Sequence, residues 1–240
     1  MTTEAQVEAT PIITVAEADH GAETARNYRY QAAYSVILLI GAAAGRLDLK
    51  SVWCEQHDDI LAQINERLFD AYQVKTQRPE RGAWELTDEP FVKSLKTFLK
   101  LDAEYNGQFR RFHFVSNTEC LETEDKKKKH LCPKTLVQTA TSCFRPEDLD
   151  DSTRKGFQLV LDATAGAANN LFKILQKLVF VKGPSRESFE SEIAQNHIGQ
   201  LEWCQLTQDK LERLVNRACP KNVFFQKPDY DQYSFLASMY

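Results

Sequence analysis

The 240-residue sequence lacks most of the short motifs that identify common enzyme classes. It has no glycine-rich phosphate loop, no HExxH motif and no GxSxG motif. Its six cysteines include no CxxC pair, and their spacing around His130 matches no common zinc-ligand pattern, so free thiols are expected. The sequence therefore gives no support to a phosphate-loop NTPase, a zinc protease or an α/β-hydrolase.

Long hydrophobic runs are also missing. The longest apolar stretch without a charge covers residues 34–45, whereas a membrane-spanning helix needs about 17 residues or more. The first residues include Glu4 and Glu8, where a signal peptide would carry lysines. We therefore expect no membrane span and a cytoplasmic protein.

The formal net charge is −4, which disfavours a protein that binds nucleic acid by overall charge alone. The charge is unevenly distributed along the chain. Residues 73–134 hold 13 basic and 10 acidic side chains, and the parts before and after them are both acidic. A polyanion is therefore expected to contact this middle part.

Hydrophobic spacing predicts a mixed α/β chain. A helix fits residues 25–46, where apolar residues recur at intervals of three and four. Three strands are expected next, at residues 49–55, 58–64 and 68–76. They are followed by a helix from about residue 88 and a strand at residues 110–116. Residues 118–150 show no clear period, and further helices are expected at 152–180, 186–197 and 207–218.

This order suggests three parts of the chain. Residues 1–24 have no sustained period and are expected to form a mobile leader. Residues 25–150 are expected to form the core, and residues 151–240 a helical extension that could offer an interaction surface.

The segment at residues 54–76 carries the side chains most suited to chemistry. Gln73 and Lys75 lie two apart on an expected strand, so they point to the same face while Val74 turns into the core. The hairpin between Asp59 and Gln73 can bring its ends side by side. We therefore expect Asp59, Gln73 and Lys75 to form one cluster, with Glu55 and Asp58 nearby. If Asp59 faces the cluster, Asp58 should face away from it.

A carboxylate, an amide oxygen and a lysine suit the hydrolysis of a phosphodiester. Hard oxygen ligands bind Mg²⁺, which keeps several of its waters and can bind the scissile phosphate. A lysine can orient the attacking water and offset negative charge in the transition state. A surface hairpin with an ordinary lysine is the alternative.

The sequence resembles the PD-(D/E)XK nuclease superfamily in its QxK variant, since QVK follows acidic residues within the order helix, three strands, helix, strand. Over about residues 26–117 it is similar to the double-stranded-DNA endonuclease domain of bacterial anti-phage effectors, of CBASS and Lamassu type. The residues that carry this resemblance are Tyr28, Tyr30, Gln31, Glu55, Asp58, Asp59, Ile60, Tyr72, Gln73, Val74, Lys75, Trp84, Phe112, His113 and Phe114.

The resemblance implies an α/β (α+β) fold with a restriction-endonuclease-like core and a C-terminal helical extension. It implies that Asp59 binds the metal, that Gln73 completes the metal site, and that Lys75 is the catalytic lysine. Gln31 matches a Glu or Gln that often reaches the same site. The metal would be Mg²⁺, with Mn²⁺ as a possible substitute. Because Gln73 is neutral, two metal ions would require a further ligand such as Glu55.

Double-stranded DNA is the expected partner, and several cations could contact its phosphates. The candidates are Arg78, Arg81, Lys93, Lys96, Arg110 and Arg111. The lysine run at 126–129 is expected to be a solvated loop, with a phosphate contact as the alternative.

The resemblance also implies a sensor module or an SMC-like ATPase as a partner. Because a net charge of −4 gives one copy little attraction for a duplex, a homo-oligomer is expected in the active state, with the helices from about residue 152 onward as its contact surface. No sensor domain follows the core, so sensing is expected to belong to a separate subunit unless the chain is a piece of a longer one. A catalytically silent module that holds DNA or supports assembly is the alternative function. The retention of Asp59, Gln73 and Lys75 favours the enzyme.

Overall fold

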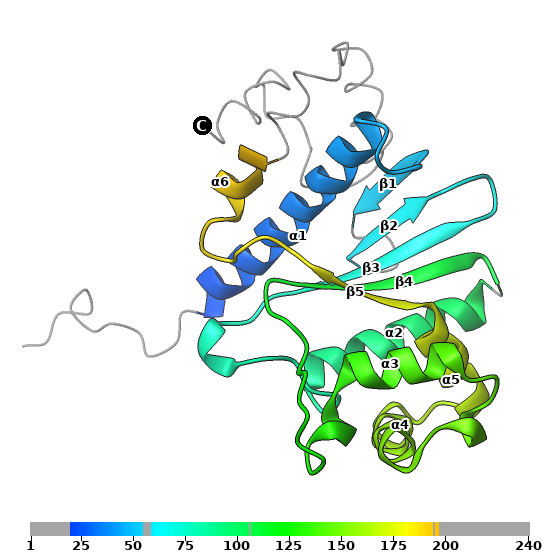
Figure 1. The fold of residues 1–240 in the computed structure, drawn as a ribbon. Helices are drawn as coiled ribbons and strands as arrows, with labels where there is room; N and C mark the ends of the chain where they lie inside the picture. The colour runs from blue at the N-terminus through cyan, green and yellow to red at the C-terminus, as the bar shows by residue number, and fades with distance from the viewer. Residues whose placement is uncertain (1–19, 55–58, 106, 194, 197–240) are drawn as a thin grey trace, which may run out of the picture.

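The computed structural model describes residues 20–54, 59–105, 107–193 and 195–196, and these form a mixed sheet with helices on both faces (Figure 1). The elements are, in order, α1 (His20–Ala43), β1 (Ser51–Cys54), β2 (Ile60–Gln63), β3 (Phe69–Lys75), η1 (Pro79–Arg81), α2 (Glu89–Glu104), β4 (Phe109–Ser116), η2 (Lys129–Leu131), α3 (Pro133–Ser142), η3 (Pro146–Asp148), α4 (Asp151–Thr164), α5 (Ala168–Lys177), β5 (Leu178–Lys182) and α6 (Phe189–Ile193).

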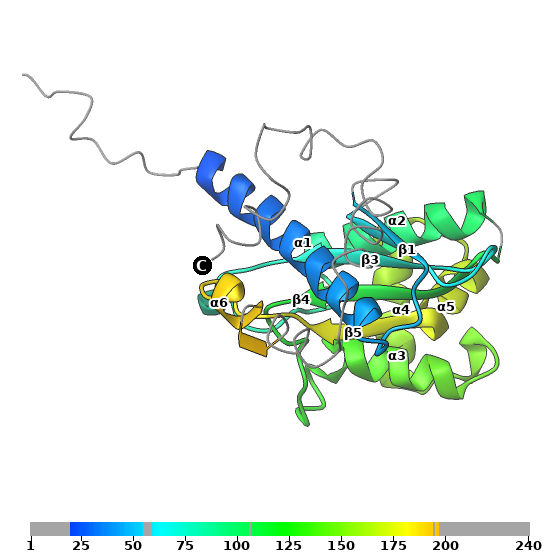
Figure 2. The ribbon, with the colours of Figure 1, turned by 90° about the horizontal axis from the view of Figure 1, so that it is seen from above.

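The strands lie in the order β1-β2-β3-β4-β5, which is also their order along the chain. β1, β2 and β3 pair antiparallel, whereas β3, β4 and β5 pair parallel. Parallel strands end at the same edge of a sheet. Lys75, Ser116 and Lys182, the last residues of these three strands, are register partners in one row across that edge. Figure 2 shows β3, β4 and β5 side by side.

One face of the sheet is covered by α1 and α6. Tyr30, Tyr34 and Leu38 recur along α1 at helical spacing and are buried with Tyr72 and Val74 of β3. The Tyr30 hydroxyl donates a hydrogen bond of 2.7 Å to the carbonyl of Pro184, in the loop that follows β5. This face therefore joins the start of the described chain to its last strand.

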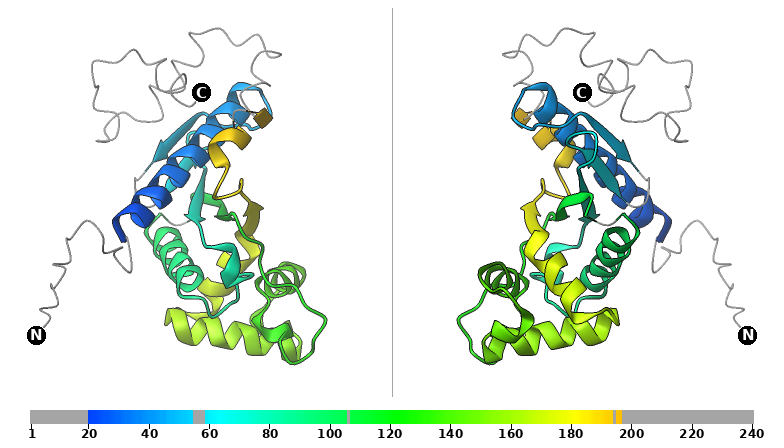
Figure 3. Two further views of the ribbon diagram at one scale, coloured as in Figure 1. Left: turned by 90° about the vertical axis from the view of Figure 1, so that its left-hand side faces the viewer. Right: turned by 90° about the vertical axis from the view of Figure 1, so that its right-hand side faces the viewer.

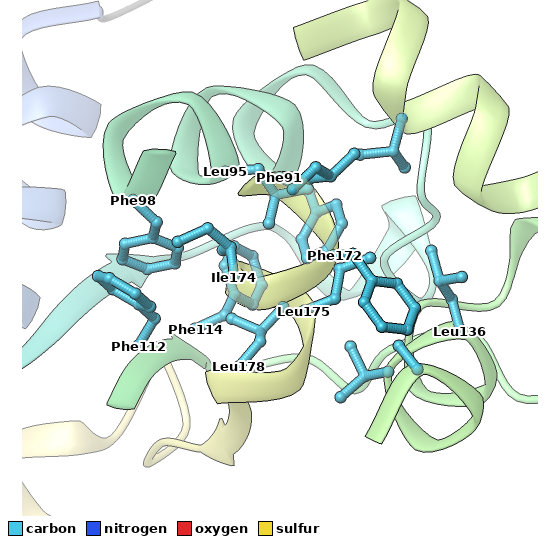
Figure 4. Packing of buried hydrophobic residues seen from close by; sticks show 14 of the residues in the cluster. Phe91, Leu95, Phe98, Phe112, Phe114, Leu136, Phe172, Ile174, Leu175 and Leu178 are labelled. Atoms are coloured by element: carbon cyan, nitrogen blue, oxygen red, sulfur yellow. The ribbon is translucent and has the colours of Figure 1, made fainter. Parts of the chain in front are cut away.

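The opposite face carries a larger core in which aromatic rings pack among aliphatic side chains (Figure 4). Phe98 of α2 lies against Phe112 of β4 with ring centroids 4.8 Å apart, and Phe91 meets Phe114 edge-on at 5.1 Å. α5 packs beside α2 on this face, and α3 and α4 form an outer layer behind them, as Figure 3 shows. Edge-to-face and offset rings add to the stability that burial provides.

The predicted fold class and the order helix, three strands, helix, strand are confirmed. Two expectations beyond that core were wrong. Residues 118–150 contain α3, and residues 152–180 form α4, α5 and most of β5 instead of one helix. α4 ends because Ala165 adopts a left-handed conformation with φ of 53°. The apolar run of β5 is compatible with either a buried helix or a buried strand, and pairing with β4 decides for the strand.

Other expectations fall partly outside the described residues. Residues 20–24 of the predicted leader belong to α1. Residues 1–19 and the helix expected at residues 207–218 lie outside the described residues. The division at residue 150 remains a prediction, although Phe157 and Leu171 beyond it share one hydrophobic cluster with Phe91. Among the described helices, none is long and apolar enough to cross a membrane.

Gly156 in α4 provides a test of this packing. In a helix interior, replacing glycine with alanine normally stabilises by about 0.5–1 kcal/mol. Here an added Cβ would lie 2.6 Å from the backbone carbonyl oxygen of His130. We expect Gly156→Ala to lower the free energy of unfolding by about 1–3 kcal/mol, measured by urea denaturation.

Gly41→Ala in α1 is the matched control, because its Cβ would meet the flexible end of the Leu47 side chain at 2.7 Å instead of a backbone atom. It should change stability less than Gly156→Ala. Equal effects of the two substitutions would contradict the tight contact between α4 and η2.

Candidate functional site

An ion pair closes the carboxyl end of β3. Asp59 Oδ2 accepts hydrogen bonds from Lys75 Nζ at 2.8 Å and from the Val74 backbone N–H at 2.7 Å. The Asp59 and Lys75 side chains are only 13% and 24% exposed, so the pair is shielded but reachable. Asp59 Oδ1 has no hydrogen-bond partner among the described residues, which leaves one carboxylate oxygen free.

Gln73 belongs to the same face of the sheet. The antiparallel register pairs Ile60 with Tyr72, and extending it by one residue places Asp59 opposite Gln73. Lys75 follows Gln73 by two residues and therefore faces the same way. The structure thus brings Asp59, Gln73 and Lys75 to one edge and one face, on the side that α2 covers.

The Gln73 side chain is buried, with 2% exposed surface, and Ser94 of α2 holds one end of its amide. Ser94 Oγ lies 3.3 Å from Gln73 Oε1 and 2.8 Å from the carbonyl oxygen of Pro90. A hydroxyl has one hydrogen to donate, and the shorter bond to Pro90 claims it.

Rotating the Gln73 amide by 180° resolves this conflict, since Nε2 then donates to Ser94 Oγ. As placed, Gln73 Nε2 faces away from Ser94 and has no partner within the described chain. In the rotated form the amide oxygen would take this buried position, beside the strand end that carries Lys75.

Side-chain amides fix the segments that leave the sheet at this edge. Asn117, just after β4, accepts from the Gln77 backbone N–H at 3.0 Å and donates to the Gln77 carbonyl at 2.9 Å. Thr76 donates at 2.6 Å to Asn27 of α1. The exits of β3 and β4 are thereby tied to each other and to the first helix, which reduces the freedom of Lys75 to move away.

The remaining predicted site residues fall into two groups. Gln31 of α1 donates a long hydrogen bond of 3.5 Å to the Val74 carbonyl, so it reaches β3 from the opposite face. It makes no hydrogen bond to Asp59, Gln73 or Lys75. Glu55 and Asp58 lie outside the described residues and remain predictions.

The predicted DNA contacts are spread over the molecule. Arg78 and Arg81 lie in the loop that follows β3, near Lys75, and both are exposed. Lys93 and Lys96 are exposed on α2, and Lys93 pairs with Glu89 at 2.7 Å. The assignment stays a prediction, and the geometry favours the two arginines after β3.

Arg110 and Arg111 begin β4 at the opposite edge of the sheet, about 16 Å from the Lys75 end at 3.3 Å per residue. Arg110 binds Asp70 through two hydrogen bonds, of 3.1 and 2.6 Å. His113 lies 3.3 Å from the same carboxylate. Burial raises the pKa of Asp70, but the hydrogen bonds and charges of His113 and Arg110 outweigh it and hold the pKa below its usual range.

Within the described residues, no group of three or more His, Cys, Asp or Glu side chains is placed to hold a metal ion. The oxygen donors that the site offers are Asp59 Oδ1 and the Gln73 amide. A carboxylate beside a buried amide oxygen suits a hard cation.

Ser94 is the residue that sequence reasoning missed. It follows Phe91 by three positions and precedes Phe98 by four, so it falls in the apolar stripe of α2. A polar residue on such a stripe needs a buried partner. This interruption of the stripe was the available signal.

Comparison with known proteins identifies one family. The model of the Cap4 double-stranded-DNA endonuclease domain matches residues 19–220. No curated protein matches the chain, and no solved structure matches it. The matched range includes every described element and the strand end that carries Asp59, Gln73 and Lys75.

The buried Asp70 cluster predicts how stability depends on pH. Because the folded pKa of Asp70 is lowered, its contribution is complete above the unfolded value of about 3.9 and is lost as the pH falls through the folded pKa. Asp70→Asn should therefore lower the free energy of unfolding by about 1–3 kcal/mol at pH 7. Urea titrations should show this difference shrinking below pH 4, and a difference that grows on acidification would contradict the lowered pKa.

Proposed function

Since the chain belongs to the family of Cap4 double-stranded-DNA endonuclease domains, effector nucleases of CBASS anti-phage defence, we propose that Asp59, Gln73 and Lys75 hydrolyse the phosphodiester bond. This assignment makes the site a QxK variant of the PD-(D/E)XK type. The observation that supports it best is the shielded ion pair of Asp59 and Lys75 beside a buried glutamine with an unpaired amide atom.

Asp59 and Gln73 would hold the metal, which we propose to be Mg²⁺, with Mn²⁺ as a substitute. Asp59 offers Oδ1, and Gln73 offers its amide oxygen once Ser94 has accepted the amide N–H. Glu55 is the further ligand that we propose for this site. When bound, the metal supplies Lewis-acid chemistry to a phosphate oxygen and lowers the pKa of a bound water.

Lys75 acts on the reacting phosphate. Its ammonium group has three N–H donors, and the structure uses one of them on Asp59. The other two can reach a phosphate oxygen and the attacking water. Positive charge held in place beforehand stabilises the negative charge that grows in the transition state.

Gln31 would support this site indirectly. Its hydrogen bond to the Val74 carbonyl acts on the peptide segment whose N–H holds Asp59. We propose that α1 thereby fixes the strand end between the proposed metal ligand and Lys75.

Control by a partner is also proposed. A nuclease with little sequence preference would damage its host if it were always active. With a net charge of −4, one copy has little long-range attraction for a duplex, and several copies would add their cations along one DNA. We propose that a sensor or SMC-like ATPase subunit assembles copies into the active form.

Removing the lysine tests the site. Lys75→Ala should reduce cleavage of plasmid DNA by at least two orders of magnitude, because it removes a preorganised charge from the transition state. The melting temperature should change little, since partly exposed ion pairs contribute only about 0–1 kcal/mol. Lys173→Ala, on the exposed side of α5, is the matched control. Wild-type cleavage by Lys75→Ala would overturn the assignment.

Metal removal tests the donor set. EDTA should stop cleavage, and Mg²⁺ or Mn²⁺ should restore it, because the proposed ligands are oxygen atoms. Gln73→Glu should keep activity and require less Mg²⁺ for half-maximal rate, since it adds a charge to the site. Gln73→Leu should require more. Cleavage that survives the chelator would refute metal dependence.

A further inference from the structure

A second group of cations lies at the same edge of the sheet as Lys75. Ser116 of β4 is the register partner of Lys75, and Lys182 of β5 is the register partner of Ser116. Register partners in parallel strands point to the same face. Two interstrand steps of about 4.8 Å place the Lys182 backbone about 10 Å from that of Lys75.

A cavity of about 220 Å³ opens beside Lys182. This volume admits several water molecules or one hydrated phosphate group. Phe114 and Phe180 line it, together with Lys134 from the first turn of α3. The residues that line it are Phe114, Ser116, Thr118, Glu119, Cys120, Lys134, Phe180, Val181 and Lys182.

One carboxylate stands between the two lysines of this cavity. Glu119 Oε2 lies 3.1 Å from Lys134 Nζ, and Glu119 Oε1 lies 3.7 Å from Lys182 Nζ. Hydrogen bonding to Lys134 is the main cause that lowers the pKa of Glu119. Glu122, which is largely exposed, approaches Lys134 only to 3.9 Å. Glu119 therefore occupies the position that an anion shared by both ammonium groups would take.

Two hydroxyl groups in the cavity lining have hydrogens to donate. Thr118 Oγ1 is buried and has no partner within the described chain. Ser116 Oγ accepts from the Trp84 indole N–H at 2.7 Å and from the Thr118 backbone N–H at 3.1 Å, so its own hydrogen has no acceptor among the described residues. Apart from Glu119, the polar side chains of the lining are thus donors, which favours an anionic ligand.

The nearby thiol adds no competing chemistry. Burial raises the pKa of the Cys120 thiol to about 12, so it stays neutral and unreactive.

We propose that this cavity binds a backbone phosphate of the DNA close to the scissile phosphate. This inference rests on the proposed function of Asp59, Gln73 and Lys75. Lys134 and Lys182 hold the phosphate, and Glu119 is displaced when it arrives. The site thereby sets the register of the DNA along the sheet edge.

Duplex binding in EDTA tests the site without cleavage. The dissociation constant of a short DNA duplex is measured across a series of salt concentrations. Lys134→Gln and Lys182→Gln should each weaken binding several-fold and reduce the slope of log K against log salt by about 0.9 for a lost phosphate contact. Glu119→Gln should strengthen binding, because it removes the competing carboxylate.

Lys173→Gln on α5 is the matched control, because α5 leads into the opposite end of β5. It should leave affinity and slope unchanged, and all variants should keep the wild-type melting temperature. Unchanged slopes for both Lys134→Gln and Lys182→Gln would overturn the proposal, as would a wild-type chain that binds no DNA even at protein concentrations where copies associate.

A second measurement separates DNA from a free anion. Inorganic phosphate is titrated against the wild type and Lys182→Gln by calorimetry. Binding of phosphate that Lys182→Gln abolishes, without any effect on the duplex, would show a free-anion site and refute the DNA contact. Failure of the catalytic assignment looks different. In that case Lys75→Ala would cut DNA normally, while Lys134→Gln and Lys182→Gln would still weaken binding.

Discussion

The parallel pairing of β3, β4 and β5 is the constraint on which the rest of the molecule depends. Three strands that run in one direction must end at one edge, and their last residues then share a row. Lys75, Ser116 and Lys182 come from distant parts of the chain, yet this register places them side by side. The hydrophobic core between the sheet and α2 holds the register, because sliding one strand by a residue would turn its buried rings to the other face of the sheet.

Most of the core could be predicted because it is local in sequence. Alternation in residues 68–76 and the apolar stripe of α2 define their elements without help from the rest of the chain. The meeting of Asp59 with Lys75 also follows from a short hairpin. β5 could not be predicted in the same way, because its apolar run suits two structures and only the edge of β4 selects between them.

The details of the site depend on packing, which explains why they were not foreseen. The orientation of the Gln73 side-chain amide depends on Ser94 of α2. Ser94 is itself fixed by its hydrogen bond to the carbonyl of Pro90, one turn earlier. From the sequence, Arg110 was predicted to be a cation available to contact DNA. The fold places a buried carboxylate, Asp70, directly against it. A charged residue in the sequence can be assigned to ligand binding only when the fold shows whether another side chain already pairs with it.

A common arrangement links the cations at the strand ends. Lys75 is paired with Asp59, Lys134 and Lys182 share Glu119, and Arg78 lies 3.8 Å from Glu23. A polyanion that binds at such an edge must displace these carboxylates from the cations, because the cations are already paired. Each exchange returns a carboxylate to water and gains a phosphate contact, so the net gain per contact is smaller than for a free lysine. Several such contacts must then form together before a duplex is held. This arrangement supports the proposal that copies of the chain act together on DNA.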